Sequence, residues 1–144
     1  MTDICLMFEV HQPFRLNRNF HSDLLSKQKL SKNDLFDLYF DQGLNRYVFE
    51  RAAKKCYFPT NNIILEQIEK SKSQGKPFKV AYGISGVFLE QCELWSPDLI
   101  ESFRQLAETG CVEFMDETYH HSLASLYGAD HTEFVEQVKM HRQL

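Results

Sequence analysis

Three short runs of β-forming residues, separated by segments with helical periodicity, are the feature that most constrains the fold of this 144-residue chain. The runs are residues 4–10, 79–85 and 111–115, and each is rich in apolar, β-branched or aromatic side chains. Strands that alternate with helices form βαβ units, whose strands pair in parallel. The pattern therefore predicts an α/β protein with a parallel sheet that keeps at least one unpaired edge.

Helical signals fill the intervals between these runs. The clearest helix has Ser96 as its N-cap and Pro97 in its first position, and Gly110 ends it. A polar loop is expected over residues 17–33. The other helices expected between the runs are residues 44–54, 62–73 and 86–93.

The last segment carries a capping-box pattern, with Asp130 followed three positions later by Glu133. Apolar residues then recur at helical spacing towards His141, and no helix-stop signal precedes Leu144. We expect this helix to run to the end of the sequence, and the sequence to be a piece of a longer domain.

Composition excludes several classes of protein. The net charge of −4, with no basic patch, argues against a nucleic-acid binder. Membrane spans need about 20 consecutive apolar residues, which the chain lacks, and its acidic N-terminus is unlike a signal peptide. The cysteines lie far apart, so we expect reduced thiols in a cytoplasmic protein, three of them (Cys5, Cys92 and Cys111) buried and the fourth being Cys56.

Alternation along the strands assigns side chains to two faces. The first run places Glu9 and His11 on the face opposite to its apolar set, and the third run places Glu113 opposite to its own apolar set. The second run offers small residues on one face, Gly83 among them. The acids either reach water at a sheet edge or point into a cleft at the carboxyl ends of the strands, where α/β folds bind ligands. The apolar set of the first run is Ile4, Leu6, Phe8 and Val10, and we expect all four to be covered by helices.

Two polar segments follow strands and could carry function. One is residues 11–13, His-Gln-Pro, and the other is residues 113–122, which holds three acids, two histidines and a tyrosine. The second could equally be a polar surface loop. Because His120 and His121 are adjacent, at most one of them should face a cleft. The histidines lack the spacing of zinc ligands, so no metal is expected.

These segments resemble the α-amylase-like branch of glycoside hydrolase family 57. The resemblance covers essentially all 144 residues, and its most specific part is residues 110–123. The other matching segments are residues 9–13, 39–41, 55–61, 84–86 and 89–91.

The resemblance implies that residues 1–144 are the N-terminal portion of an incomplete (β/α)7 barrel, truncated here and belonging to a single catalytic domain. It also implies a retaining enzyme that acts on an α-glucan or maltooligosaccharide without a cofactor. The nucleophile Glu and the acid/base Asp would lie beyond this segment, so it holds no catalytic residue and should be inactive alone. The implied substrate-binding residues are His11, Gln12, Glu113, Glu117, Tyr119 and His121.

Several alternatives stay open at this point. The enzyme could be an α-amylase or a 4-α-glucanotransferase, depending on whether water or a sugar hydroxyl intercepts the glycosyl-enzyme. A carbohydrate deacetylase of related barrel shape would need a metal site, and bound zinc would favour it. A non-catalytic sugar-binding module is the third reading. The sequence leaves the oligomeric state undetermined.

Overall fold

A three-stranded parallel sheet organises the computed structural model, which describes residues 4–21, 30–126, 128 and 130–144. The strands lie in the order β1-β2-β3, with β2 in the centre. This arrangement confirms the predicted α/β class with parallel strands. The strands are β1 (Met7–Val10), β2 (Val80–Ile84) and β3 (Val112–Met115).

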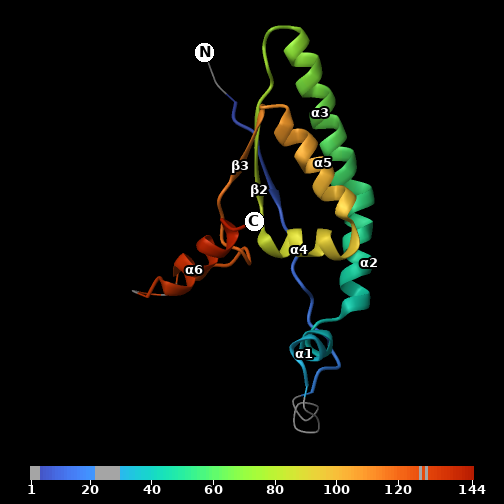
Figure 1. Cartoon of the computed structure of the whole chain (residues 1–144), viewed down its shortest axis with the longest axis vertical. Helices are drawn as coiled ribbons and strands as arrows, with labels where there is room; N and C mark the ends of the chain where they lie inside the picture. Colours follow the sequence, from blue (N-terminus) through green and yellow to red (C-terminus); the bar gives the residue numbers. More distant parts are fainter. Residues whose placement is uncertain (1–3, 22–29, 127, 129) are drawn as a thin grey trace.

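Helices connect the strands and cover one side of the sheet. Figure 1 shows α3 and α5 side by side along the sheet, with α6 on the other side of β3. The connection from β1 to β2 contains α1 (Lys32–Tyr39), α2 (Gln42–Ala52), a π-helical turn (Ala53–Tyr57) and α3 (Phe58–Ser73). The remaining elements are α4 (Gly86–Trp95), α5 (Pro97–Glu108), a 3-10 turn (Ala124–Leu126) and α6 (Thr132–His141).

The core lies between the sheet and these helices. Val80, Tyr82 and Ile84 alternate along β2 and are all buried against the helices, as the strand period requires. The apolar set of the first run divides: Phe8 and Val10 pack at the core, whereas Ile4 and Leu6 precede β1 and are exposed. The prediction that all four are covered was therefore wrong.

The opposite face of the sheet is more open and carries the polar residues. The register places Glu9 beside Gly83 and Gly83 beside Met115 in one row across the three strands. The row nearer the amino ends of the strands contains Met7, Ala81 and Glu113. Met7, Glu9, Glu113 and Met115 are all exposed to some degree, so this face is accessible to ligands.

The first connection differs from its prediction. The expected break between two helices is absent, because the π-helical turn joins α2 to α3 and Pro59 is accommodated at the start of α3. Helix α1 was missed. It begins inside the expected polar loop, at a capping box between Ser31 and Asp34. Residues 22–29 of that loop lie outside the described residues.

The C-terminal helix also begins and ends differently. The Asp130 carboxylate accepts a hydrogen bond from the Thr132 amide, while Glu133 accepts one from the Gln137 side chain, so the expected capping box is absent. Helix α6 ends at His141 and does not continue to the last residue.

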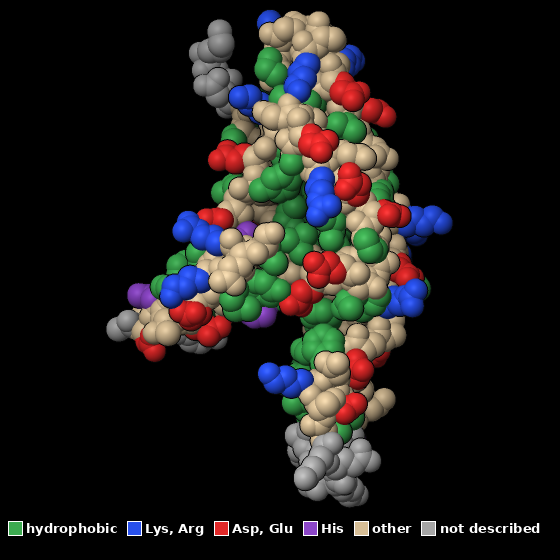
Figure 2. All heavy atoms as spheres, viewed as in Figure 1, with side chains coloured by type: hydrophobic (Ala, Val, Ile, Leu, Met, Phe, Trp, Pro, Cys, Tyr) green, Lys and Arg blue, Asp and Glu red, His purple; other side chains and the backbone are tan. Residues whose placement is uncertain are grey.

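The surface carries charges of both signs, and the cysteines are free. Acidic and basic side chains intersperse over the helical face in Figure 2. In the described part of the chain, every helix is too short or too polar to cross a membrane. All four cysteines are free, as predicted; Cys92 and Cys111 are buried, but Cys5 is exposed because it precedes β1.

Candidate functional site

Side chains from all three strand ends converge at the carboxyl edge of the sheet. Glu9 lies on β1 and His11 directly follows it, whereas Glu117 and His121 lie in the loop between β3 and α6. Ser85 directly follows the central strand and lies between them. Because the carboxyl ends of parallel strands meet at one edge, residues more than a hundred positions apart become neighbours.

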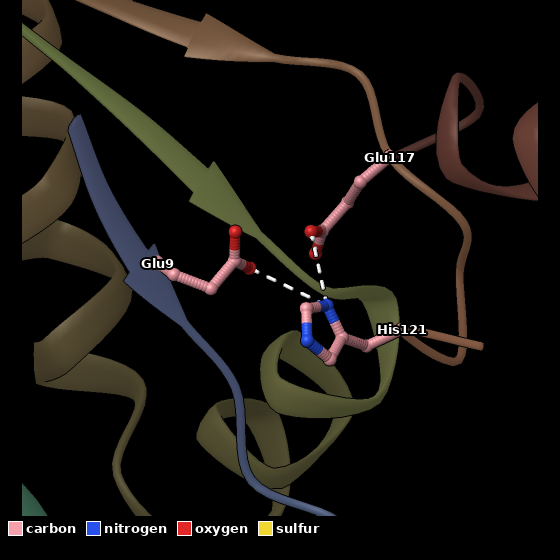
Figure 3. A group of neighbouring side chains, drawn as sticks. All are labelled: Glu9, Glu117 and His121. Carbon is pink, nitrogen blue, oxygen red and sulfur yellow. Dashed lines mark hydrogen bonds and ion pairs between the residues drawn. The ribbon is translucent and has the colours of Figure 1, made fainter. Parts of the chain in front are cut away.

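The centre of this group is His121, whose Nδ1 atom faces two carboxylates (Figure 3). Its Nδ1 lies 3.5 Å from Glu9 Oε1 and 3.4 Å from Glu117 Oε2. One ligand atom from each of the three residues lies within 4.8 Å of the other two. We call Glu9, Glu117 and His121 the carboxylate–histidine cluster.

Glu117 is the most enclosed member of the cluster. Its side chain is 14% exposed, against 42% for Glu9 and 43% for His121. Burial, followed by the hydrogen bond and charge of Glu9, raises the pKa of Glu117 to about 8. Glu117 Oε1 is buried and has no hydrogen-bond partner among the described residues. The carboxylate is therefore held in a setting that disfavours its charge.

His11 stacks on His121 and closes one side of the cluster. The ring centroids are 4.5 Å apart and the planes are inclined by 29°. Ser85 Oγ lies 2.7 Å from His11 Nδ1, which fixes the ring. Burial lowers the pKa of His11, the neighbouring His121 lowers it further, and Glu9 raises it. The balance favours a neutral imidazole, which both donates and accepts hydrogen bonds.

The loop that carries His121 is fastened by Gln137 of α6. Gln137 is buried, and its Oε1 accepts hydrogen bonds from the Ser122 hydroxyl at 2.8 Å and the His120 amide at 3.3 Å. His121 itself has a φ of +52°, in the left-handed backbone region that residues other than glycine seldom adopt. The exposed His120 lies outside the cluster, in agreement with the prediction that at most one of the two adjacent histidines faces a cleft.

Tyr119 anchors the same loop to α4 and lies outside the cluster. Its ring packs on Gly86, where an added Cβ would lie only 2.3 Å from Cδ2. Its hydroxyl donates to Glu90 at 2.6 Å, and its carbonyl accepts from the Val87 amide. Burial raises the pKa of Tyr119, and the hydrogen bond and charge of Glu90 raise it further.

Gln12 and Glu113 also lie apart from the cluster. The side-chain amide of Gln12 donates to the Tyr57 hydroxyl at 2.8 Å and accepts from the Arg15 side chain. The backbone carbonyl of Gln12 accepts from the Gln91 side chain. These bonds hold the turn after β1. Glu113 is exposed on the open face, one row closer to the amino ends of the strands than Glu9.

The structure thus brings together three of the six predicted site residues, His11, Glu117 and His121. It adds Glu9 and Ser85, which the predicted set did not contain. Strand alternation already placed Glu9 on the polar face beside His11, so a usable signal existed. Nothing in the sequence indicated that Ser85 would contact His11.

Comparison with known proteins identifies the family. The sequence profile described as "Glycosyl hydrolase family 57" matches residues 5–144. The chain belongs to glycosyl hydrolase family 57. It is 43% identical over 141 residues to a Methanocaldococcus jannaschii protein named "Putative alpha-amylase", and the match covers 98% of this chain.

A solved structure has the same fold. The 4-alpha-glucanotransferase of Thermococcus litoralis superposes on 94% of this chain with a TM-score of 0.59 and 20% identity. This chain spans 27% of the Methanocaldococcus jannaschii relative and 15% of the Thermococcus litoralis chain. This chain therefore corresponds to one part of each of these longer proteins.

Proposed function

We propose that residues 1–144 form the substrate-binding part of a retaining glycoside hydrolase that acts on α-glucans or maltooligosaccharides, of α-amylase or 4-α-glucanotransferase type. The observation that carries this proposal is the stacked pair of His11 and His121 beside two carboxylates at the carboxyl edge of the sheet. Barrel and open-sheet α/β enzymes place their ligands at this edge.

The chemistry of the group suits a sugar. Sugar hydroxyls donate and accept hydrogen bonds, carboxylates accept them, and a neutral imidazole does both. We assign His11 and His121 to hydrogen bonds with sugar hydroxyls and to no proton transfer in the covalent step. The lowered pKa of His11 supports this role, because the neutral ring keeps one accepting nitrogen.

The other predicted residues are assigned by their positions. Glu117 contributes its carboxylate beside His121. Glu113 shares the open face of the sheet, so an oligosaccharide lying along that face would reach its carboxylate. Gln12 and Tyr119 support the site by holding the turn after β1 and the loop after β3.

The proposal places the nucleophile Glu and the acid/base Asp outside these 144 residues, in a single catalytic domain of which this chain is one part. This chain matches only a short part of each relative, which supports that arrangement. The names of those relatives, an α-amylase and a 4-α-glucanotransferase, support an α-glucan as substrate. The four free cysteines support a cytoplasmic location.

Calorimetric titration with maltopentaose, in the presence of a chelator, tests the binding role. We expect His11→Ala and His121→Ala each to weaken binding about tenfold, the effect of losing one good hydrogen bond. His120→Ala is the matched control, since its exposed ring lies outside the cluster, and should keep the original affinity. Equal affinities in all four proteins, or no binding by the unaltered chain, would contradict the proposal.

A further inference from the structure

The carboxylate–histidine cluster has the arrangement of a metal-ligand set assembled by the fold. Its members come from β1 and from the loop after β3, and their polar atoms point towards one another (Figure 3). One oxygen from each carboxylate and one ring nitrogen lie within 4.8 Å of each other. Such convergence of three potential ligands on one point is what a cation site requires.

The distances are those of long, weak hydrogen bonds and also fit ligands around a shared ion. Hydrogen bonds from nitrogen to oxygen usually measure about 2.7–3.2 Å. The two contacts of His121 Nδ1 are longer, 3.5 Å to Glu9 Oε1 and 3.4 Å to Glu117 Oε2. Zinc binds carboxylate oxygen and imidazole nitrogen at about 2.0–2.2 Å, so two tetrahedral ligands lie about 3.4 Å apart.

The two facing carboxyl groups also suit a cation. Two carboxylates face one another, and an imidazole offers them at most one positive charge. Glu117 Oε1 is buried without a hydrogen-bond partner in the described ranges, and burying such a group costs free energy. A divalent ion would neutralise both carboxylates and give Glu117 a partner.

We propose that Glu9, Glu117 and the Nδ1 atom of His121 bind one divalent cation of the zinc type. Carboxylate oxygen combined with imidazole nitrogen is a donor set that zinc accepts readily, whereas Mg²⁺ prefers six oxygen ligands. The exposed sides of Glu9 and His121 leave the fourth position open to water or to a hydroxyl of a bound molecule.

Neighbouring residues prepare this geometry. His11 stacks on the His121 ring and is itself fixed by Ser85, so the imidazole keeps its orientation. Gly83 leaves space for the Glu9 carboxylate, because a Cβ there would lie 2.9 Å from Glu9 Oε2. Partners of this kind orient the ligands of metal sites.

The proposal concerns the site of the proposed function but does not depend on sugar binding. Zinc is titrated in the absence of sugar, and maltopentaose is titrated in the presence of chelator. Loss of one kind of binding is therefore distinguishable from loss of the other. The exposed thiols of Cys5 and Cys56 also bind zinc, so the titrations use a protein that carries Cys5→Ser and Cys56→Ser.

Calorimetry with Zn²⁺ alone, on chelator-treated and desalted protein, gives the test. We expect one tight site per chain, with Mg²⁺ bound at least about tenfold more weakly. Glu117→Gln and His121→Ala should each weaken zinc binding at least about 100-fold, since even residues outside the ligand shell cost about 10–100-fold. Circular dichroism confirms that the variants stay folded.

Two controls match these variants. His120→Ala removes the adjacent exposed imidazole, and Glu108→Gln removes an exposed carboxylate on α5. Both should keep the original zinc affinity. The proposal is overturned if the background protein binds no zinc, if Glu117→Gln and His121→Ala bind zinc as tightly as the background does, or if both controls lose binding equally.

Discussion

The imidazole rings of His11 and His121 stack with their centroids 4.5 Å apart, although β2 lies between the strands that they follow. Outer strands of a three-stranded sheet are about 10 Å apart, so the contact must pass over the end of the central strand. On this side β2 carries Gly83 and is followed by Ser85, and neither residue is large enough to separate the rings. Small residues at the end of β2 thus leave room for the two rings to stack.

Gly83→Ala tests this dependence. The new Cβ would lie 2.9 Å from Glu9 Oε2, so the Glu9 carboxylate has to move away from His121. We expect about tenfold weaker maltopentaose binding. The free energy of unfolding should change by less than about 1 kcal/mol, because the end of the Glu9 side chain is flexible and alanine suits a strand better than glycine. Calorimetry and urea denaturation give the two quantities.

Gly43→Ala is the control for this substitution. Its Cβ would meet only Asp41 Oδ1, at 3.7 Å, within helix α2. Alanine should stabilise that helix by up to about 1 kcal/mol and leave sugar affinity unchanged. Unchanged affinity in Gly83→Ala as well would show that the position of Glu9 has no bearing on the site.

Gly86→Ala should destabilise the fold through a different contact. The added Cβ would lie 2.3 Å from Tyr119 Cδ2, so this buried ring would have to shift. We expect a loss of about 1–3 kcal/mol in the free energy of unfolding, measured with urea. In a Tyr119→Ala background the same substitution should cost far less. An equal cost in both backgrounds would refute the clash.

The sequence predicted the parts of the site that depend on local pattern. Strand alternation placed Glu9 and His11 on one face, and a polar cluster after the third strand contained Glu117 and His121. The orientation of His121 was not predictable, because it depends on a positive φ and on a loop fastened by Gln137 of α6. Those contacts arise only when distant segments have packed.

The difference between local pattern and long-range contact also explains why the spacing of possible ligands along the sequence did not predict the metal site that we propose. Spacing rules detect ligands that lie close together along the chain, such as those on one helical turn. Glu9 is separated by more than a hundred residues from Glu117 and His121, and only the strand order joins them. In the fold, helix α1 was missed because its capping box at Ser31 lies within the polar segment that predicts a loop.

Tyr82→Phe should alter stability mainly in alkali. Burial raises the pKa of Tyr82 to about 12, from an ordinary value near 10. A raised folded-state pKa means that the contribution of the neutral phenol is complete below about pH 10 and is lost as the pH rises towards 12. The phenylalanine variant has no phenol to ionise, so its free energy of unfolding should fall by up to about 2–3 kcal/mol less than that of the unaltered protein.

At neutral pH the same variant should lose less than about 1 kcal/mol, because the Tyr82 hydroxyl lies 3.5 Å from Asn61 Oδ1 and forms a weak bond. Urea denaturation between pH 7 and pH 12 measures both effects. Tyr47→Phe is the control, since Tyr47 is well exposed. If both variants follow the unaltered protein through alkaline pH, burial of Tyr82 does not contribute to the alkaline loss.

Residues 1–144 alone should neither hydrolyse nor transfer α-glucans. A retaining glycosidase needs two carboxyl groups about 5–5.5 Å apart across the scissile bond. Glu9 and Glu117 both contact the same nitrogen of His121, at 3.5 and 3.4 Å, so the two carboxylates are grouped on one ring and do not face each other across a sugar. Glu113 is exposed on the open face of the sheet, without the enclosed, low-dielectric surroundings that stabilise developing charge.

Chromatography of maltooligosaccharides after incubation with purified protein measures this turnover. The comparison is a longer family 57 protein that contains this segment together with the remaining strands. We expect products only from the longer protein, because the proposed nucleophile and acid/base lie outside residues 1–144. Turnover by residues 1–144 that disappears in Glu117→Gln or Glu113→Gln would instead place the catalytic pair within this segment, since each substitution removes one carboxylate and keeps the size of the side chain.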